Sequence, residues 1–249
     1  MSKSTGLGAR FFVDGVNLSG DIGSLQRMNN SLATTEQQGL DKEAFERLHA
    51  LRTGGCEFSA WMNKAAGAAH PTLKTRPTTD RIASYFHRAT LGTSAFGLVC
   101  KQLNYDPTRT KEGALSWSVT AESNGYGLEW GKSLTAGART DTAATNGASV
   151  DFGAGTSFGM QAYLHVFSFT GTDASILVQA SSDNGGADAF AEPSGGFTFP
   201  AVTTAPYAQR LTTASPIERY LRVVTVTTGG FTNLQFALLV VKNTHAVVF

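Results

Sequence analysis

Runs in which apolar and polar residues alternate recur along most of this chain. In LSWSVTAES (115–123), Leu115, Trp117, Val119 and Ala121 alternate with polar residues, and CEFSAWM (56–62) repeats the pattern. Successive side chains of a β-strand point to opposite faces, so this period predicts strands with one buried face. RFFVDGVNLSG (10–20) predicts a tight hairpin that turns at Asp14-Gly15.

One segment in the first half has helical spacing instead. In LDKEAFERLHALR (40–52), the apolar residues that share one helical face are Ala44, Phe45, Leu48 and Leu51. Asp41 is a suitable N-cap, Leu40 and Phe45 occupy hydrophobic-staple positions, and Gly54 and Gly55 follow as stop signals. The pattern predicts a helix over residues 41–52.

The second half reads as strands throughout. Short apolar runs are bounded by Gly, Asn, Asp or Pro: MQAYLHVFSF, ASILVQAS, FTFPAV, YAQRLTT, ERYLRVVTV and NLQFALLVVK. Closely spaced strands with such turns are typical of an antiparallel β-sandwich. We therefore expect a mainly β protein with an α+β first domain of packed sheets or a barrel, one flanking helix, and a sandwich after it.

Two polar stretches suggest how the chain is divided. Residues 133–157 (SLTAGARTDTAATNGASVDFGAGTS) have few apolar anchors and predict a linker or long exposed loop. We place the domain boundary near Thr140, which gives domains 1–139 and 140–249. Residues 63–80 predict a long irregular loop, and a loop of that length in a small domain is usually functional.

Composition narrows the function classes. Lys plus Arg is 20 and Asp plus Glu is 19 among 249 residues, and 16% are charged. Residues 1–138 carry 15 basic and 12 acidic side chains, whereas residues 139–249 carry 5 and 7. This balance gives no global reason to bind nucleic acid. The N-terminus lacks a signal-peptide pattern and no apolar run could span a membrane. Cys56 and Cys100 are expected to be buried and reduced.

A search for catalytic and metal-binding motifs predicts no catalytic, cofactor-binding or metal-binding residue. No nucleophile motif, phosphate loop or zinc motif occurs. The histidines have no metal-ligand spacing: His49, His70, His87, His165 and His245. We therefore expect a protein that is not an enzyme and has no cofactor.

Two weaker patterns remain. Asp183 and Asp188 share the turn SSDNGGAD and could bind Ca²⁺, although a solvated hairpin tip is the better interpretation. DRIASYFHR places Arg81 and Arg88 among aromatic residues, as some nucleic-acid binders do, but it also reads as a plain strand.

The order of elements in residues 10–135 resembles the major tail tube proteins of long-tailed bacteriophages. The matching segments are FVDGVNLSGDIGSLQ, DKEAFERLHALRTGG, CEFSAWMN and KQLNYDPTRTKEGALSWSVTAESNGYGLEWG. The second half resembles sandwich modules appended to virion proteins, through QASSDNGGADAF, FTFPAVTTAPYAQRL and ERYLRVVTVTTGGFTNLQFALLVVKN.

This resemblance implies a virion protein that assembles in the host cytoplasm into stacked rings, usually six-fold, whose lumen passes DNA without sequence recognition. Its partners would be copies of itself, a tape measure protein, and the tail terminator and distal tail proteins, with no membrane. Residues 1–10 and 63–80 would make contacts between rings. The sandwich would lie outside and could contact cell-surface glycans.

An acidic lumen would help DNA to slide. On this interpretation Glu57, Glu112, Glu122 and Glu129 would line it. Two alternatives stay open, another virion structural protein (capsid decoration protein or connector) and a carbohydrate-binding sandwich. The second would show exposed aromatic residues on one face, for which the nearest candidates are Tyr163, His165 and Phe167.

Overall fold

The computed structural model describes residues 5–75 and 78–247, and this part of the chain is mainly β. The first half contains β1 (Arg10–Val13), β2 (Val16–Asn17), β3 (Ile22–Gln37), β4 (Glu46–Trp61), α1 (Ala69–Leu73), β5 (Arg81–Phe86), β6 (Ser94–Gln102), β7 (Asp106–Arg109), β8 (Leu115–Ser123) and β9 (Glu129–Ser133). The second half contains β10 (Arg139–Asp141), β11 (Thr145–Asn146), β12 (Val150–Asp151), β13 (Met160–Gly171), β14 (Ser175–Ser181), β15 (Tyr207–Thr213), β16 (Tyr220–Val226) and β17 (Phe231–Lys242). The prediction of a mainly β fold is confirmed.

The alternating segments form strands with the expected buried faces. β4 pairs antiparallel with β8, and Phe58 lies opposite Val119 in a register that buries both. The turn between β1 and β2 is also as predicted, because Asp14 and Gly15 both have positive φ angles (49° and 76°), which a type I′ turn requires.

The predicted helix over 41–52 is wrong. Its second half belongs to β4, which pairs with β3 as far as Gln37↔Glu46, and a turn precedes it. Leu48 and Leu51 are exposed, so the apolar stripe that suggested a helix has no core to pack against. Gly54 does not end the element. A Cβ there would lie 2.4 Å from the backbone nitrogen of Leu128, so glycine permits a close approach within a continuous strand. The helix in the described residues is α1, inside the 63–80 segment.

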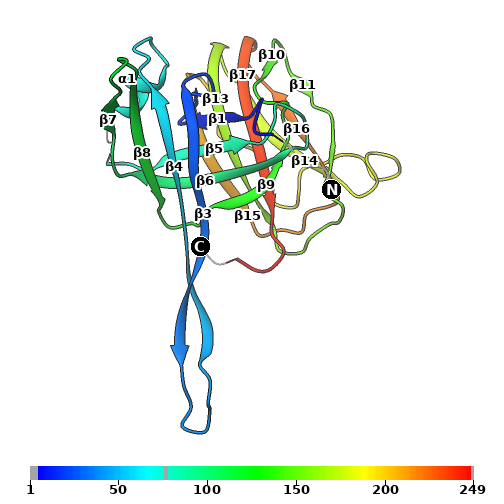
Figure 1. Cartoon of the computed structure of the whole chain (residues 1–249). Helices are drawn as coiled ribbons and strands as arrows, with labels where there is room; N and C mark the ends of the chain where they lie inside the picture. The colour runs from blue at the N-terminus through cyan, green and yellow to red at the C-terminus, as the bar shows by residue number, and fades with distance from the viewer. Residues whose placement is uncertain (1–4, 76–77, 248–249) are drawn as a thin grey trace.

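The second half is a sandwich around its own core. β13, β15 and β17 belong to a 13-stranded sheet, and β14 and β16 belong to a 4-stranded sheet packed against it. Buried residues of both sheets meet in this core, among them Leu164, Leu238, Val178 and Val223. Figure 1 shows these strands on the right-hand side of the body.

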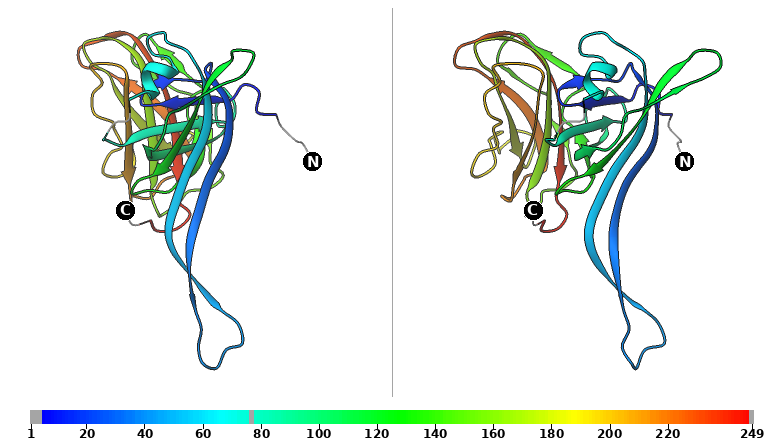
Figure 2. Two further views of the ribbon diagram at one scale, coloured as in Figure 1. Left: turned by 60° about the vertical axis from the view of Figure 1, so that its left-hand side comes forward. Right: turned by 90° about the vertical axis from the view of Figure 1, so that its left-hand side faces the viewer.

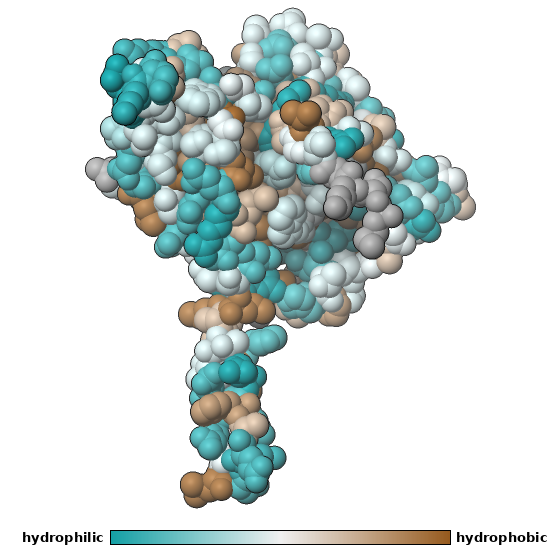
Figure 3. All heavy atoms as spheres, viewed as in Figure 1, coloured by the Kyte–Doolittle hydropathy of each residue, from teal (hydrophilic) through white to brown (hydrophobic). Residues whose placement is uncertain are grey.

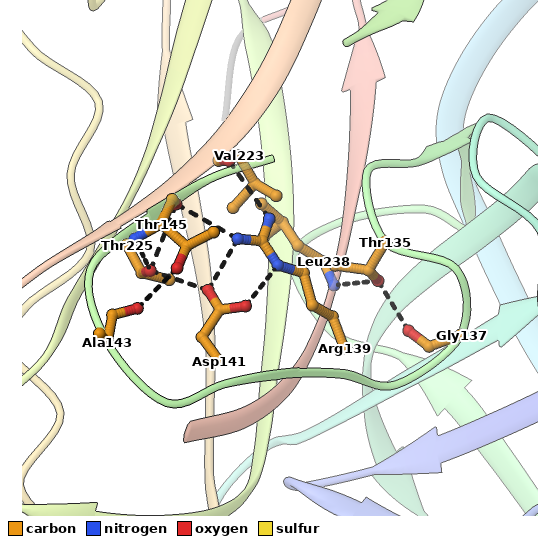
Figure 4. Close-up of polar contacts among 9 residues, drawn as sticks. All are labelled: Thr135, Gly137, Arg139, Asp141, Ala143, Thr145, Val223, Thr225 and Leu238. Carbon is orange, nitrogen blue, oxygen red and sulfur yellow. Dashed lines mark hydrogen bonds and ion pairs between the residues drawn. The ribbon is translucent and has the colours of Figure 1, made fainter. Parts of the chain in front are cut away.

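Residues 133–157 were expected to be a linker or a long exposed loop. Their strands belong to the sandwich, so the segment is no linker, while residues 142–146 are exposed. β10 pairs with β17, and β11 and β12 pair with β16. Arg139 donates to both carboxylate oxygens of Asp141 at 2.7 Å, and Thr225 donates to the same carboxylate at 2.8 Å (Figure 4). Buried polar bonds fix this segment, which a count of its apolar residues could not reveal.

The sheet runs across the predicted boundary. β17 pairs with β9 on one side and with β13 on the other, so hydrogen bonding continues from the first half into the second. The first half has its own core, and a third cluster joins the halves with residues such as Phe12, Tyr163 and Leu239. The division into 1–139 and 140–249 stays a prediction.

In the described part of the chain, no helix has the length and hydrophobicity that crossing a membrane requires.

Candidate assembly surface

The most prominent feature of the molecule is a hairpin made of β3 and β4. The base of β4, from Gly55 to Trp61, pairs with β8 and belongs to the body. Beyond Gly54 the two strands continue as six further residue pairs, from Ser31↔Thr53 to Gln37↔Glu46. At about 3.3 Å per residue, this outer part extends roughly 20 Å before the turn. Figures 1 and 2 show it projecting well clear of the body.

The outer hairpin carries large apolar side chains in solvent. Leu51 is 84% exposed and Phe45 60% exposed, and the others on the outer hairpin are Leu32, Leu40 and Leu48. Figure 3 shows apolar patches at the root, in the middle and at the tip of this stalk, separated by polar ones. Fully burying one such side chain contributes about 1.5–3 kcal/mol, so a partner that covered several of them would gain considerable free energy.

Both edges of the outer hairpin are open. In the ranges 5–75 and 78–247, β3 pairs with β4 alone, and β4 has no second partner beyond Gly55. Open strand edges present unpaired N–H and C=O groups, which can bind another strand. β3 is irregular at three places, between Ile22/Ser24, Leu25/Arg27 and Leu32/Thr34. Such bulges bend a strand and restrict which strand can pair with it.

Charge on the hairpin is largely paired. Arg47 Nη2 lies 2.8 Å from Glu36 Oε1 across the two strands, and Lys42 Nζ lies 3.7 Å from Glu46 Oε1 near the turn. These pairs are exposed and each contributes little to stability. They leave the apolar side chains as the main candidates for contact.

The outward face at the base of the hairpin is polar. On this face Ser59 of β4 lies opposite Ser118 of β8, and Glu57 lies opposite Thr120. Glu122 is the next residue of β8 on the same face, opposite Gly55. Arg27 lies 3.4 Å from Glu57, and Lys101 on β6 lies 2.7 Å from Asp80. Arg27 and Lys101 next to this face therefore have acidic partners.

Two of the four glutamates expected in a lumen lie on this face, Glu57 and Glu122. Glu112 is exposed in the turn between β7 and β8. Glu129 is buried between the halves of the chain, where Arg210 Nε lies 3.1 Å from its carboxylate and Tyr163 donates a hydrogen bond to it. The four side chains therefore do not share one surface.

The aromatic residues proposed for glycan binding are not exposed together. Tyr163 and His165 are fully buried, and Phe167 is partly buried against Phe12. His165 Nδ1 accepts from the backbone N–H of Gly15 at 3.2 Å. Because β13 lies between β15 and β17 and its face is covered by the first half, this candidate surface is wrong.

The 63–80 segment packs onto the body where it is described. Asp21 accepts hydrogen bonds from the side chain of Asn63 (2.8 Å) and the backbone of Ala69 (2.9 Å). Arg81 donates to the carbonyls of Thr72 and Thr75. Residues 76–77 of this segment, and residues 1–4 of the expected 1–10 contact, lie outside the described residues. Their roles between rings stay predictions.

The remaining candidates have simple structural roles. Cys56 and Cys100 are buried and free, as expected. Asp183 accepts from the backbone N–H groups of Gly186 and Ala187, which makes the SSDNGGAD segment a self-bonded turn. Within the described residues, no three His, Cys, Asp or Glu side chains gather as a metal site would require.

Arg81 lies in the first-half core rather than on a nucleic-acid surface. Its side chain is buried, and Nη1 donates to Asp14 at 2.9 Å. Sequence reasoning missed the hairpin itself because the leucines at 48 and 51 fit a helical period. The signal that could have revealed it was the pair Gly54-Gly55 leading directly into the alternating run 56–62.

No protein-family model matches this sequence, and no curated protein is similar to it. Among solved structures, it resembles a chain from the tail of an empty GTA particle with C6 symmetry, at 10% identity and TM-score 0.40, over 52% of this chain and 98% of that chain. It resembles the SPP1 Dit protein, described as a paradigm of the hub adsorption apparatus in phages that infect Gram-positive bacteria, at 10% identity and TM-score 0.36, over 93% and 98%. It also resembles a chain of the phage P2 baseplate in its activated conformation with Ca, at 8% identity and TM-score 0.34, over 95% and 99%. All three TM-scores lie below 0.5.

Proposed function

We propose that this chain is a structural subunit of a bacteriophage tail, and that its copies join side by side into stacked rings that form the tail tube. The observation that carries the proposal is the projecting hairpin, with open edges and exposed leucines. A two-stranded hairpin is at best marginally stable by itself in water. Its outer part is therefore expected to gain stability from a neighbouring subunit.

A second copy of the chain is the occupant that the geometry favours. The hairpin of one copy would lie against the body of the next, which is a head-to-tail contact between two different surfaces. Such contacts close into rings or continue as helical filaments. Leu32, Leu48 and Leu51 would supply the apolar contact, and the open edge of β3 would supply backbone hydrogen bonds.

The polar face at the base of the hairpin suits the wall of a channel for DNA. It presents hydroxyl groups and the carboxylates of Glu57 and Glu122, and Arg27 and Lys101 beside it are paired with acidic side chains. Because tight DNA binding comes from Lys and Arg that neutralise phosphates, such a wall would let DNA pass without sequence recognition. Residues 1–139 would build the ring, and residues 140–249 would lie on its outside.

On this proposal the rings are six-fold and belong to the virion, after assembly in the host cytoplasm. The further partners are a tape measure protein and the tail terminator and distal tail proteins. A capsid decoration protein or a connector would also associate through exposed strands, and binding to a capsid lattice instead of tube formation would favour that function.

Electron microscopy of the concentrated full-length protein tests the proposal. We expect rings or hollow tubes, and we expect them to vanish when residues 32–52 are replaced by Asn-Gly, which closes the hairpin after Ser31↔Thr53. The shortened protein should stay folded, because the cores contain no residue of that segment. Tubes of normal appearance from the shortened protein would contradict the hairpin's role. The exposed Leu103→Glu variant is the matched control and should still assemble.

A further inference from the structure

A groove of about 610 Å³ lies where the two halves of the chain meet, beside the root of the outer hairpin. It is lined by β9, by the loop that follows β12, and by the end of β17 with the residues after it. Binding pockets for small molecules usually measure about 300–1,000 Å³, so the groove can hold a ligand of one or two rings.

Aromatic side chains form one part of its lining. Trp130 is 43% exposed and Phe158 is 42% exposed, and the half-buried Phe152 also lines the groove. Trp130 is positioned by an edge contact with the buried Phe96, with ring centroids 5.5 Å apart. Exposed, positioned aromatic rings in a groove are suited to stack on a flat apolar ligand face.

Two lysines make the groove positive. The ammonium groups of Lys132 and Lys242 lie 5.3 and 5.5 Å from the centroid of the Phe152 ring. Lys132 donates to the carbonyl of Asp151 at 2.8 Å, and Lys242 donates to the carbonyl of Glu218 at 2.7 Å. Carbonyl oxygens position these charges without neutralising them.

The carboxylate nearest to the lysines is already engaged. Asp151 accepts two hydrogen bonds from Arg219, at 2.6 and 2.8 Å, so its charge is balanced by a third cation. Burial and the nearby Lys132 lower the pKa of Lys242 to about 8, although Asp151 acts in the opposite direction. An anion between the two ammonium groups would relieve their repulsion.

We propose that this groove binds an acidic sugar unit, whose ring stacks on Trp130 and Phe158 while its carboxylate or phosphate lies between Lys132 and Lys242. The groove also presents hydroxyl and amide side chains that suit sugar hydroxyls: Thr156, Ser157, Asn243 and Thr244. The lysines supply the charge recognition, and the aromatic residues recognise the ring. A site of this kind on a tail subunit would recognise anionic surface polysaccharides, but its ligand chemistry does not depend on ring formation.

Ligand titrations of the full-length protein at pH 7 test this site, with tryptophan fluorescence and ligand-observed NMR as readouts. The probes are glucuronic acid and glucose 6-phosphate as acidic sugars, glucose as a neutral sugar, inorganic phosphate as an anion without a ring, and AMP as a nucleotide. We expect both acidic sugars to bind at least about tenfold more tightly than glucose or phosphate. Glucose has no charge for the lysines to bind, and phosphate has no ring for the aromatic residues to contact. The proposal is overturned if no acidic sugar binds, if phosphate alone binds as tightly, or if AMP binds more tightly than both sugars.

Variants locate the binding. Lys132→Gln and Lys242→Gln should each weaken acidic-sugar binding about tenfold, whereas Lys242→Arg should retain most of it. Trp130→Ala should abolish the fluorescence response and weaken binding, and circular dichroism would confirm that the variants are folded. Lys111→Gln and Trp61→Ala are matched exposed controls outside the groove, and both should bind like the original protein. Equal weakening by the controls would contradict the assignment.

Discussion

Arg210 Nε lies 3.1 Å from Glu129 Oε2 in an ion pair that joins β15 to β9, and both side chains are almost fully buried. Tyr163 donates to the same carboxylate, and the guanidinium lies 3.9 Å from the centroid of the Tyr126 ring. The pair therefore connects the first half of the chain to the second. Its interior position makes the loss of either partner costly.

Replacing one partner of this pair should destabilise the whole protein. Arg210→Met leaves the Glu129 carboxylate buried without its cation, which usually costs about 3–5 kcal/mol. Urea unfolding at pH 7 would measure this as a lower midpoint. Arg47→Gln removes an exposed pair with Glu36 and should leave the midpoint nearly unchanged. Equal midpoints for both variants would contradict the structural role of the buried pair.

A charge on the hairpin should prevent assembly without unfolding the subunit. Leu51→Glu places a carboxylate where the proposed contact buries a leucine, and the side chain is exposed in the single subunit. We expect sedimentation velocity to show subunits at concentrations where the original protein forms larger species, with an unchanged unfolding midpoint. If the variant assembles normally, Leu51 lies outside the contact.

His165 should make stability depend on pH below 6.5. Its Nδ1 accepts from Gly15 N–H, and the other ring nitrogen lies 2.9 Å from Ser84 Oγ, so the buried ring is neutral. Burial lowers its pKa to about 3, whereas the unfolded value is about 6.5. The unfolded state binds more protons between these values, so stability present above pH 6.5 falls by about 1.4 kcal/mol per pH unit as the pH decreases.

Comparison of unfolding at pH 7.5 and pH 5 isolates this effect. The original protein should lose about 2 kcal/mol more than His165→Asn over that interval, because the variant cannot take up the proton. Other acidic and histidine groups are common to both proteins and cancel in the difference. The same loss in both proteins would show that His165 is not the group responsible.

The two cysteines should resist alkylation in the folded protein. Burial raises the pKa of Cys56 to about 12 and that of Cys100 well above its ordinary value, so almost no thiolate forms at pH 8. Mass spectrometry after treatment with iodoacetamide should show no adduct in buffer and two adducts in urea. Rapid labelling in buffer would mean that the first-half core opens readily.

The alternating pattern and the turn residues correctly predicted those features of the fold that depend on residues close together in the sequence. The buried faces of β4 and β8 follow directly from residues 56–62 and 115–123, and the β1–β2 turn follows from Asp14-Gly15. The helix prediction for residues 41–52 failed because their apolar spacing fits a helix. The local pattern could not identify β3 as the partner with which residues 46–52 pair as a strand.

The candidate site was less predictable for the same reason. From the sequence, Glu129 and Tyr163 were expected at the surface. In the structure, Glu129 pairs with Arg210 and accepts a hydrogen bond from Tyr163 in the interior. Lys132 and Lys242 are 110 positions apart and meet at the Phe152 ring only through the pairing of β9 with β17. No spacing rule connects residues so distant in the chain.

The continuity of the sheet also has a mechanical consequence. A pull along the hairpin would act parallel to β4 and β8, whose ladder holds seven residue pairs. When strands are pulled in that direction, the force is shared by all the hydrogen bonds between them. A perpendicular pull would break these hydrogen bonds one after another. The load would pass from β8 through β6 and β9 to β17 without crossing a flexible joint. Within each subunit of a tube, the backbone hydrogen bonds of this continuous sheet would resist stretching.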